Sequence, residues 1–209
     1  MNESLIDELI NLAFKEDIRE GDHSSLASIP RSAQGKAKLL VKDEGIIAGV
    51  ALAQKIFHHF DENLSISTFI SDGDKVKKGD VVFTVEGASL SILQTERLVL
   101  NVMQRMSAIA TKTAHYVGLV KDYNTQILDT RKTTPGLRTI EKLAVKIGGG
   151  TNHRHGLYDM IMLKDNHIDY AGGISQAIEK TVNYLHEKEL DLKIEVEARN
   201  LAEVEEILK

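Results

Sequence analysis

The chain of 209 residues contains no cysteine. Disulfide bonds and thiolate chemistry, whether nucleophilic or metal-binding, are therefore excluded. The lack of cysteine suits the reducing cytosol, so we expect a cytoplasmic protein. Hydrophobic residues make up 42% and charged residues 27% of the chain, as in ordinary globular proteins of one or two domains.

Long apolar runs and tryptophan are also missing. No run approaches the ~20 apolar residues that span a bilayer. The first ten residues, MNESLIDELI, lack the basic start and apolar core of a signal peptide. With a formal net charge of −5, the chain lacks the overall excess of basic residues that is typical of nucleic-acid-binding proteins. We expect neither a membrane nor a nucleic acid as a partner.

Positive charge is nevertheless concentrated between residues 131 and 164. Seven basic and two acidic residues lie there, a local excess of +5. Three of the basic residues fit the exposed face of a predicted helix and are expected to be ordinary surface charges: Arg138, Lys142 and Lys146. The other four follow apolar runs or glycine turns: Arg131, Lys132, Arg154 and Lys164. Because Arg and Lys bind carboxylates and phosphates, these four predict a pocket for a small polyanion.

The first half of the chain, 1–108, is predicted to be an α+β domain. Helical spacing covers 5–14 and 51–60, and short extended runs predict strands at 36–42, 45–50, 64–70 and 81–85. A long helical pattern follows from 93 to 123, and we expect it to break near Ser107 into two helices. This helical segment is the expected hinge between two domains.

The segment 72–82 favours a second reading of this domain. It resembles the flattened barrel-sandwich hybrid of biotinyl and lipoyl carrier domains, which present a modified lysine in a hairpin. No lysine flanked by methionine stands in such a hairpin here. We therefore interpret the segment as a small structural sheet with tight Gly-Asp turns.

The second half, 109–209, alternates between strands and helices. Strands are predicted at 125–130, 158–163 and 192–198, and helices at 136–147, 174–186 and 201–208. The strands end at Thr130, Lys164 and Glu197, spacings typical of β/α repeats. We predict an α/β fold: an incomplete parallel β/α barrel with an N-terminal α+β sandwich. Such barrels carry their sites at the C-terminal strand ends, yet strict alternation places His153 and Arg154 at the opposite end. Either an extra short strand intervenes or this loop folds back.

Two glutamates on the last predicted strand suggest a metal site. Glu195 and Glu197 share one strand face because side chains alternate with period two. Acids facing a barrel interior need a cation or a lysine as partner. Glu197, nearer the C-terminal end, is the favoured ligand and Glu195 the second candidate. Mg²⁺ commonly takes one or two carboxylates together with substrate phosphates.

Three motifs, in this order and spacing, closely resemble the quinolinate phosphoribosyltransferase family: DTRKTTPGLR (129–138), GGGTNHRHGL (148–157) and LKDNH (163–167). The resemblance extends upstream to Glu96-Arg97 and to Gln104-Arg105, and covers nearly the whole chain. It implies a reaction of quinolinate with phosphoribosyl pyrophosphate that gives nicotinate mononucleotide, pyrophosphate and carbon dioxide in NAD biosynthesis. It also implies Mg²⁺ bound with the phosphoribosyl pyrophosphate.

The resemblance assigns roles to individual residues of this chain. Lys132, Lys164 and Glu197 match catalytic positions, with Glu197 near the Mg²⁺. The positions that match substrate-binding residues are Arg97, Thr130, Arg131, Lys132, His153, Arg154, Lys164 and Glu197. In the family the arginine matched by Arg97 reaches into the neighbouring subunit's pocket, which implies a homodimer.

The family continues beyond the position matched by Lys209, with an acidic strand end and a glycine-rich phosphate loop. We therefore expect the barrel in these residues to be incomplete. Two alternatives to the main reading stay open: a related phosphoribosyltransferase that uses a pyridine monocarboxylate such as nicotinate, and a non-catalytic carrier or binding protein built on segment 72–82.

Overall fold

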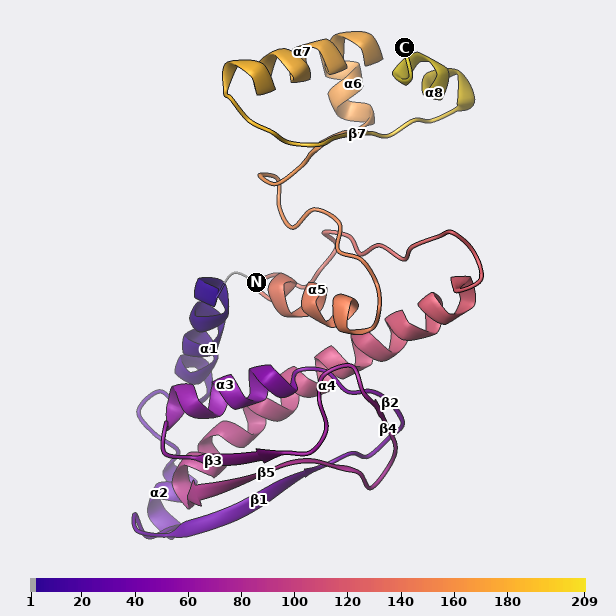
Figure 1. Cartoon of the computed structure of the whole chain (residues 1–209). Coiled ribbons are helices and arrows are strands. Elements are labelled where there is room, and N and C mark those ends of the chain that lie inside the picture. Colours follow the sequence, from indigo (N-terminus) through magenta and orange to yellow (C-terminus); the bar gives the residue numbers. More distant parts are fainter. Residues whose placement is uncertain (1–2) are drawn as a thin grey trace. The chain divides into compact units, whose positions relative to one another are not determined.

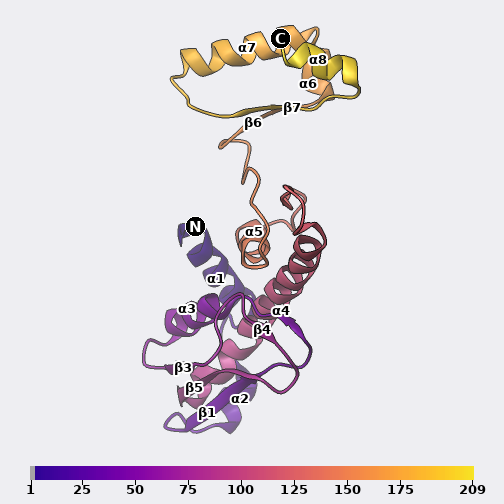
Figure 2. The same cartoon turned by 45° about the vertical axis from the view of Figure 1, so that its right-hand side comes forward.

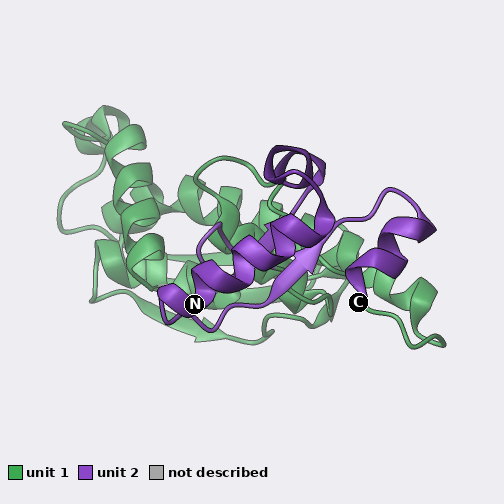
Figure 3. Cartoon of the chain, turned by 90° about the horizontal axis from the view of Figure 1, so that it is seen from above, with its two compact units in different colours: residues 1–153 green, residues 154–209 purple. Residues whose placement is uncertain are grey.

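The computed structural model describes residues 3–209 (Figure 1). It divides the chain into two compact units, with the boundary between His153 and Arg154 (Figure 3). Both units mix helices and strands, in agreement with the predicted α/β class. Within the described part of the chain, no helix is long and apolar enough to cross a membrane.

Unit 1 is built on an antiparallel sheet with the strand order β1-β5-β3. These strands are β1 (Gln34–Leu40), β3 (Ser65–Thr68) and β5 (Val81–Ala88), and a separate pair joins β2 (Gly45–Ile46) to β4 (Lys75–Val76). The helices of the unit are α1 (Glu3–Asp17), α2 (His23–Ser28), α3 (Val50–Phe60), α4 (Ser89–Val120) and α5 (Arg138–Ile147). Strand 45–50 is thus shorter than predicted, because α3 already begins at Val50.

The core of unit 1 lies between the sheet and the helices α3 and α4 (Figures 1 and 2). Val82 and Val85 on β5 are buried, as are Val99 and Met106 on α4. Phe57 of α3 meets Phe83 edge to face, with ring centroids 5.9 Å apart, a favourable aromatic geometry. The α4 residues of this core lie between Ile92 and Ala110, so the core fixes this part of α4 against the sheet and the neighbouring helices.

The predicted break near Ser107 is wrong, because α4 is one helix from Ser89 to Val120. Ser107 instead ties the helix to a neighbouring segment. Its hydroxyl accepts a hydrogen bond from the Ala48 amide at 3.0 Å and donates to the Ala48 carbonyl at 3.2 Å. One turn later the Thr111 hydroxyl accepts from the Ile46 amide at 2.9 Å. The two hydroxyls thus bond the backbone groups of Ile46 and Ala48, as a neighbouring strand would do in a sheet.

Segment 72–82, which resembles a carrier hairpin, has a structural role in unit 1. The Asp72 carboxylate accepts hydrogen bonds from the amides of Val50 (2.8 Å) and Ala51 (3.1 Å). Gly49, the residue before α3, has no side chain to cap that helix. Asp72 therefore supplies the N-terminal cap of α3 from a distant loop.

Helix α5 packs on α4, and the triple glycine ends it at their contact. A Cβ on Gly148 would clash with the backbone carbonyl of Ala110 and lie 2.8 Å from Thr113 Cβ. After the glycines, Thr151 pairs in parallel with Leu128 through the Thr151 amide and the Ile127 carbonyl (2.8 Å). This single bridge replaces the predicted strand 125–130. It also places residues 152 and 153 at the same end as 129–131, so the extra short strand is the correct alternative.

Unit 2 contains one parallel strand pair, β6 (Ile161–Leu163) and β7 (Ile194–Val196). Its helices are α6 (Asp165–Ala171), α7 (Ile174–Glu187) and α8 (Leu201–Ile207), and they lie on one side of the strands (Figures 1 and 2). Leu163, Ile168 and Ile174 form the centre of a small apolar core. The short helix α6, which the periodicity did not predict, begins directly after the strand at Asp165.

Candidate active site

The Asp129 carboxylate is the centre of a hydrogen-bond network at the end of the Leu128–Thr151 bridge. It forms an ion pair with Lys142 of α5. It also accepts hydrogen bonds from the His153 amide (2.9 Å) and from the Asn152 side-chain amide (2.6 Å). Lys142 Nζ donates in addition to the His153 carbonyl at 3.0 Å. The network therefore links the start of the 130–132 loop to His153.

The loop after Asp129 carries three of the predicted substrate-binding residues. The Thr130 hydroxyl accepts a hydrogen bond from the Lys132 amide at 3.1 Å, which bends the chain into a tight turn. Arg131 is half-buried, and its Nε is buried without a hydrogen-bond partner among residues 3–209. Lys132 is exposed. A buried donor of this kind needs an acceptor, and a ligand carboxylate or phosphate would supply one.

A second ion pair holds the far end of this loop. Glu141 of α5 accepts hydrogen bonds from Arg105 Nε of α4 (2.6 Å) and from the Thr134 amide (3.1 Å). Burial raises the pKa of Glu141, but the hydrogen bonds from Arg105 and Thr134 outweigh it and leave the pKa below its ordinary value. The charged carboxylate therefore fixes residues 133–134 against the helix pair α4–α5.

In unit 2 the candidate residues share one face of the β6–β7 pair. Ile194 and Val196 of β7 pack on the apolar core, which leaves Glu195 and Glu197 on the opposite, exposed face. Lys164 Nζ lies 3.1 Å from Glu197 Oε1, and both side chains are about half exposed (46% and 49%). The predicted common face of the two glutamates is thus present, with a lysine beside Glu197.

Arg154 is almost fully buried in unit 2, at 9% exposure. Its guanidinium donates to the Met160 carbonyl at 3.2 Å and lies 3.5 Å from the sulfur of Met162. The following turn is closed by Asp159, which accepts from the amides of His155 (2.6 Å) and Gly156 (2.8 Å). Burial raises the pKa of Asp159, but these amide hydrogen bonds lower it by more.

The carboxylates present fit a metal only in part. Within residues 3–209, no cluster of three or more His, Cys, Asp or Glu side chains is placed to hold a metal ion. Glu197 and Glu195 offer two hard oxygen donors on one strand face. That donor set suits Mg²⁺ when substrate phosphates provide further oxygens.

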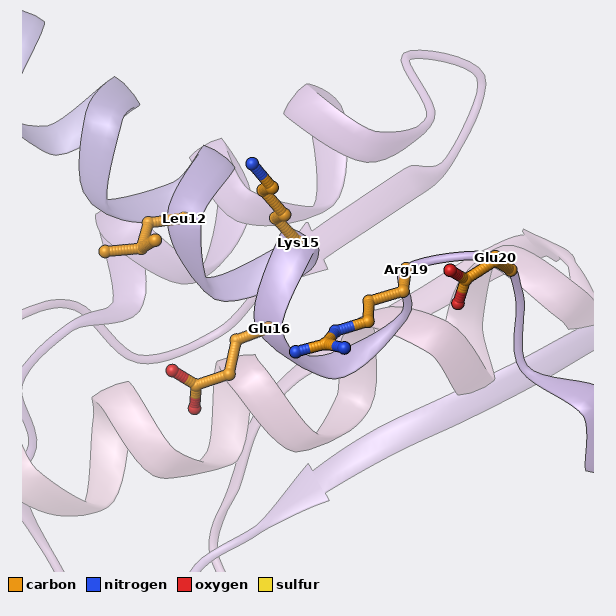
Figure 4. Close-up of a pocket in the computed structure, with 5 residues that line it drawn as sticks. All are labelled: Leu12, Lys15, Glu16, Arg19 and Glu20. Atoms are coloured by element: carbon orange, nitrogen blue, oxygen red, sulfur yellow. The ribbon is translucent and has the colours of Figure 1, made fainter.

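Two further features of unit 1 involve none of these residues. Arg97 is exposed on α4, with no ion-pair or hydrogen-bond partner among the described residues. The hollow shown in Figure 4, near the end of α1, is lined by Leu12, Lys15, Glu16, Arg19 and Glu20. None of the predicted site residues lines it, and it mixes charges of both signs.

Sequence patterns missed the residues that support the site. Lys142 was predicted as a surface charge, but it is buried (3% exposed) and paired with Asp129. The prediction failed because a lysine on an amphipathic helix normally faces water. The ion pair of Arg105 and Glu141 could not be predicted from sequence patterns either, since the two residues are 36 positions apart. The one available signal was Asp129 itself, an acid at the end of a predicted strand.

Two family models match the chain. Residues 22–107 match the model described as "Quinolinate phosphoribosyl transferase, N-terminal domain". Residues 109–209 match the corresponding C-terminal domain. The match therefore covers both halves of the chain and includes every predicted site residue.

Curated relatives and solved structures agree with these models. "Quinolinate phosphoribosyltransferase [decarboxylating] 1b" of Nicotiana tabacum is 48% identical over 202 residues, which are 96% of this chain and 57% of the relative. "Probable nicotinate-nucleotide pyrophosphorylase [carboxylating]" of Bacillus subtilis is 44% identical over 94% of this chain and 68% of its own length. The crystal structure of NadC from Streptococcus pyogenes superimposes with a TM-score of 0.92 at 39% identity, covering 99% of this chain and 72% of that one. The chain thus spans little more than half the length of the tobacco relative.

Proposed function

Because the chain belongs to the quinolinate phosphoribosyltransferase family, we propose that it acts in the transfer of a phosphoribosyl group to quinolinate with decarboxylation. This reaction is a step of NAD biosynthesis. The observation that supports the proposal most directly is the buried, unpartnered Nε of Arg131 beside the exposed cation of Lys132. In the proposed function these groups meet an anionic substrate.

Quinolinate is a flat pyridine with two adjacent carboxylates. Arg131, His153, Arg154 and Lys164 are proposed to bind it. An arginine is suited to this task because its planar fork matches a carboxylate in two hydrogen bonds. Several cations are needed, since removing two adjacent negative charges from water is costly.

Phosphoribosyl pyrophosphate is the proposed second substrate, bound by Thr130, Lys132, Lys164 and Glu197. The Lys164–Glu197 ion pair is half exposed, and exposed pairs contribute only ~0–1 kcal/mol. An incoming phosphate can therefore take over Lys164 at little cost. Glu197, with Glu195, would hold Mg²⁺, which when bound screens the charge of the pyrophosphate.

The proposed chemistry needs no protein nucleophile. The pyridine nitrogen of quinolinate attacks the anomeric carbon, the bond to pyrophosphate breaks, and the pyrophosphate leaves with that electron pair. The neighbouring carboxylate then departs as carbon dioxide, and the electron pair of the broken bond stays on the ring carbon, where the adjacent pyridinium charge stabilises it until the carbon takes up a proton. The chain's own residues contribute by holding both substrates in register and by balancing their charge.

Assembly and location complete the proposal. We propose a homodimer in which Arg97 serves the partner subunit's site, which agrees with its exposure and lack of partners among the described residues. We also propose a cytoplasmic location, which the lack of cysteine suits, while some plant relatives are described as mitochondrial or chloroplastic.

Calorimetric titration with quinolinate, and separately with nicotinate, tests the proposed function. We expect the wild type to bind quinolinate at least tenfold more tightly than nicotinate, and Arg131→Ala to bind no quinolinate at a concentration that saturates the wild type. Lys146→Ala, which replaces an exposed lysine near the end of α5, is the matched control and should bind like the wild type. Equal affinity for the two pyridines would instead favour a relative that uses a monocarboxylate.

A further inference from the structure

A buried ion pair holds the peptide groups of His153 from both sides. The Asp129 carboxylate accepts the His153 N–H, and the Lys142 ammonium donates to the His153 carbonyl oxygen. The two side chains are only 6% and 4% exposed. Neither is among the proposed substrate-binding residues, although both bond to the backbone of His153, which is one of them.

Stability alone does not require such a pair. Moving two charges out of water is costly, and apolar residues of similar volume often stabilise a fold equally well. Helix α5 already buries Ile140 and Ala144 in the core of unit 1. A charged pair additionally fixes the orientation of the groups that it bonds, because charge-assisted hydrogen bonds are short and need a defined geometry.

The network reaches both loops that leave the Leu128–Thr151 bridge. Asp129 directly precedes the 130–132 turn. The Asn152 side chain donates to Asp129 (2.6 Å) and to the Lys142 carbonyl (2.7 Å). Every member of the network is thus bonded to at least two others, which fixes Asp129, where the 129–132 loop starts, relative to His153.

We infer that Asp129 and Lys142 are positioning residues for the quinolinate-binding groups. The inference rests on the proposed function and deepens it. The pair orients Arg131 and His153 so that both meet the dicarboxylate without rearrangement. Small misplacements of binding groups cost affinity steeply, so removing the pair weakens quinolinate binding even where the fold survives.

The test compares a variant that lacks only the Lys142 charge with a variant that lacks both charges of the Asp129–Lys142 pair. Lys142→Met leaves the Asp129 carboxylate buried without its cation and should lower the melting temperature clearly. Asp129→Leu/Lys142→Met removes both charges and should restore only the part of that loss that comes from the uncompensated charge, because the His153 peptide groups and the Asn152 amide still lack their partners. We expect the double variant to bind quinolinate at least tenfold more weakly than the wild type. Lys146→Met, one helical turn further on α5, is the control and should match the wild type in both measurements.

Two additional measurements separate positioning from folding. Amide hydrogen exchange at His153 should accelerate at least tenfold in the double variant, while the amides of α5 keep their protection. Asp129→Asn/Lys142→Met keeps an acceptor for the His153 amide, so it should recover part of the quinolinate affinity. It also serves as the readout if the leucine variant does not fold.

The outcomes are distinct. A folded double variant with wild-type affinity for quinolinate overturns the positioning role and leaves the proposed function intact. A wild type that binds no quinolinate overturns the proposed function. In that case His153 exchange still decides whether the pair orients the loop: unchanged exchange in the double variant overturns this part as well.

Discussion

Glu141 shows how a single buried carboxylate shapes the loop before α5. Its pKa lies below the ordinary value because the hydrogen bonds from Arg105 and Thr134 outweigh the effect of burial. A carboxyl whose pKa is lowered on folding stabilises the protein above its unfolded pKa, ~4.3. That contribution is lost as the pH falls from there through the folded pKa.

We therefore expect Glu141→Gln to lower the free energy of unfolding at pH 7 by about 1.5–3 kcal/mol, since hydrogen bonds to a charged group are lost. The difference between variant and wild type should shrink as the pH falls below ~4.3. Urea unfolding at pH 7, 5 and 3.5 measures it. Glu62→Gln replaces an exposed glutamate and should change stability at pH 7 by less than ~0.5 kcal/mol. A variant effect that stays constant across the three pH values would show that the charge of Glu141 is unimportant.

At the scale of elements, α4 organises unit 1 through two hydroxyls. Ser107 and Thr111 bond the backbone of residues 46–48. Removing both leaves amides and carbonyls there without partners, which costs about 1–3 kcal/mol each when buried. We expect Ser107→Ala/Thr111→Val to lower the melting temperature by several degrees. Circular dichroism at 222 nm should show that α4 itself remains helical, and a loss of helix content before unfolding would contradict this account.

Two glycine-to-alanine changes should act in opposite directions on the same helix pair. Gly118 lies on α4 with open space around its missing Cβ, so alanine should stabilise by about 0.5–1 kcal/mol through helix propensity. Gly148 faces the backbone of Ala110, so alanine there should destabilise by about 1–3 kcal/mol through overpacking. Thermal unfolding of the two variants under identical conditions measures both. A Gly148→Ala variant that unfolds at or above the wild-type temperature would mean that the α4–α5 contact tolerates a methyl group.

The elements also show what a sequence can and cannot predict. The strand ends at Lys164 and Glu197 were predictable because an apolar run stops before Lys164 and an alternating pattern of apolar and charged residues ends at Glu197. The bridge at Thr151 could only be named as one alternative, since a single paired residue has no periodicity. The ion pairs of Lys142 and Glu141 were beyond sequence patterns because their partners lie 13 and 36 residues away.

At the scale of the whole molecule, family and contacts divide the chain differently. The family models meet near residue 108, whereas the compact units meet after His153. Helix α4 runs through residue 108 without interruption, and α5 packs on it. Residues 109–153 thus belong with the second half by family and with the first by packing. The domain boundary at 108 stays a prediction.

The proposed homodimer makes a prediction that only the assembled molecule can meet. If Arg97 serves the partner's site, Arg97→Ala and Arg131→Ala each abolish both sites of a dimer. In a mixed dimer, however, the Arg97→Ala subunit keeps its own Arg131 and receives Arg97 from its partner. One intact site should therefore reappear. We expect two inactive variants, unfolded and refolded together, to recover about a quarter of wild-type quinolinate binding, because half of randomly formed dimers are mixed and each has one site.

The control is each variant refolded alone, which should bind no quinolinate at a concentration that saturates the wild type. If Arg97 instead acts within its own subunit, each subunit of the mixed dimer lacks one arginine and no binding returns. Sedimentation or light scattering on the same samples establishes that dimers have formed. Recovery of binding thus requires both a dimer and an arginine shared across its interface, whereas dimers without recovery place Arg97 in its own subunit.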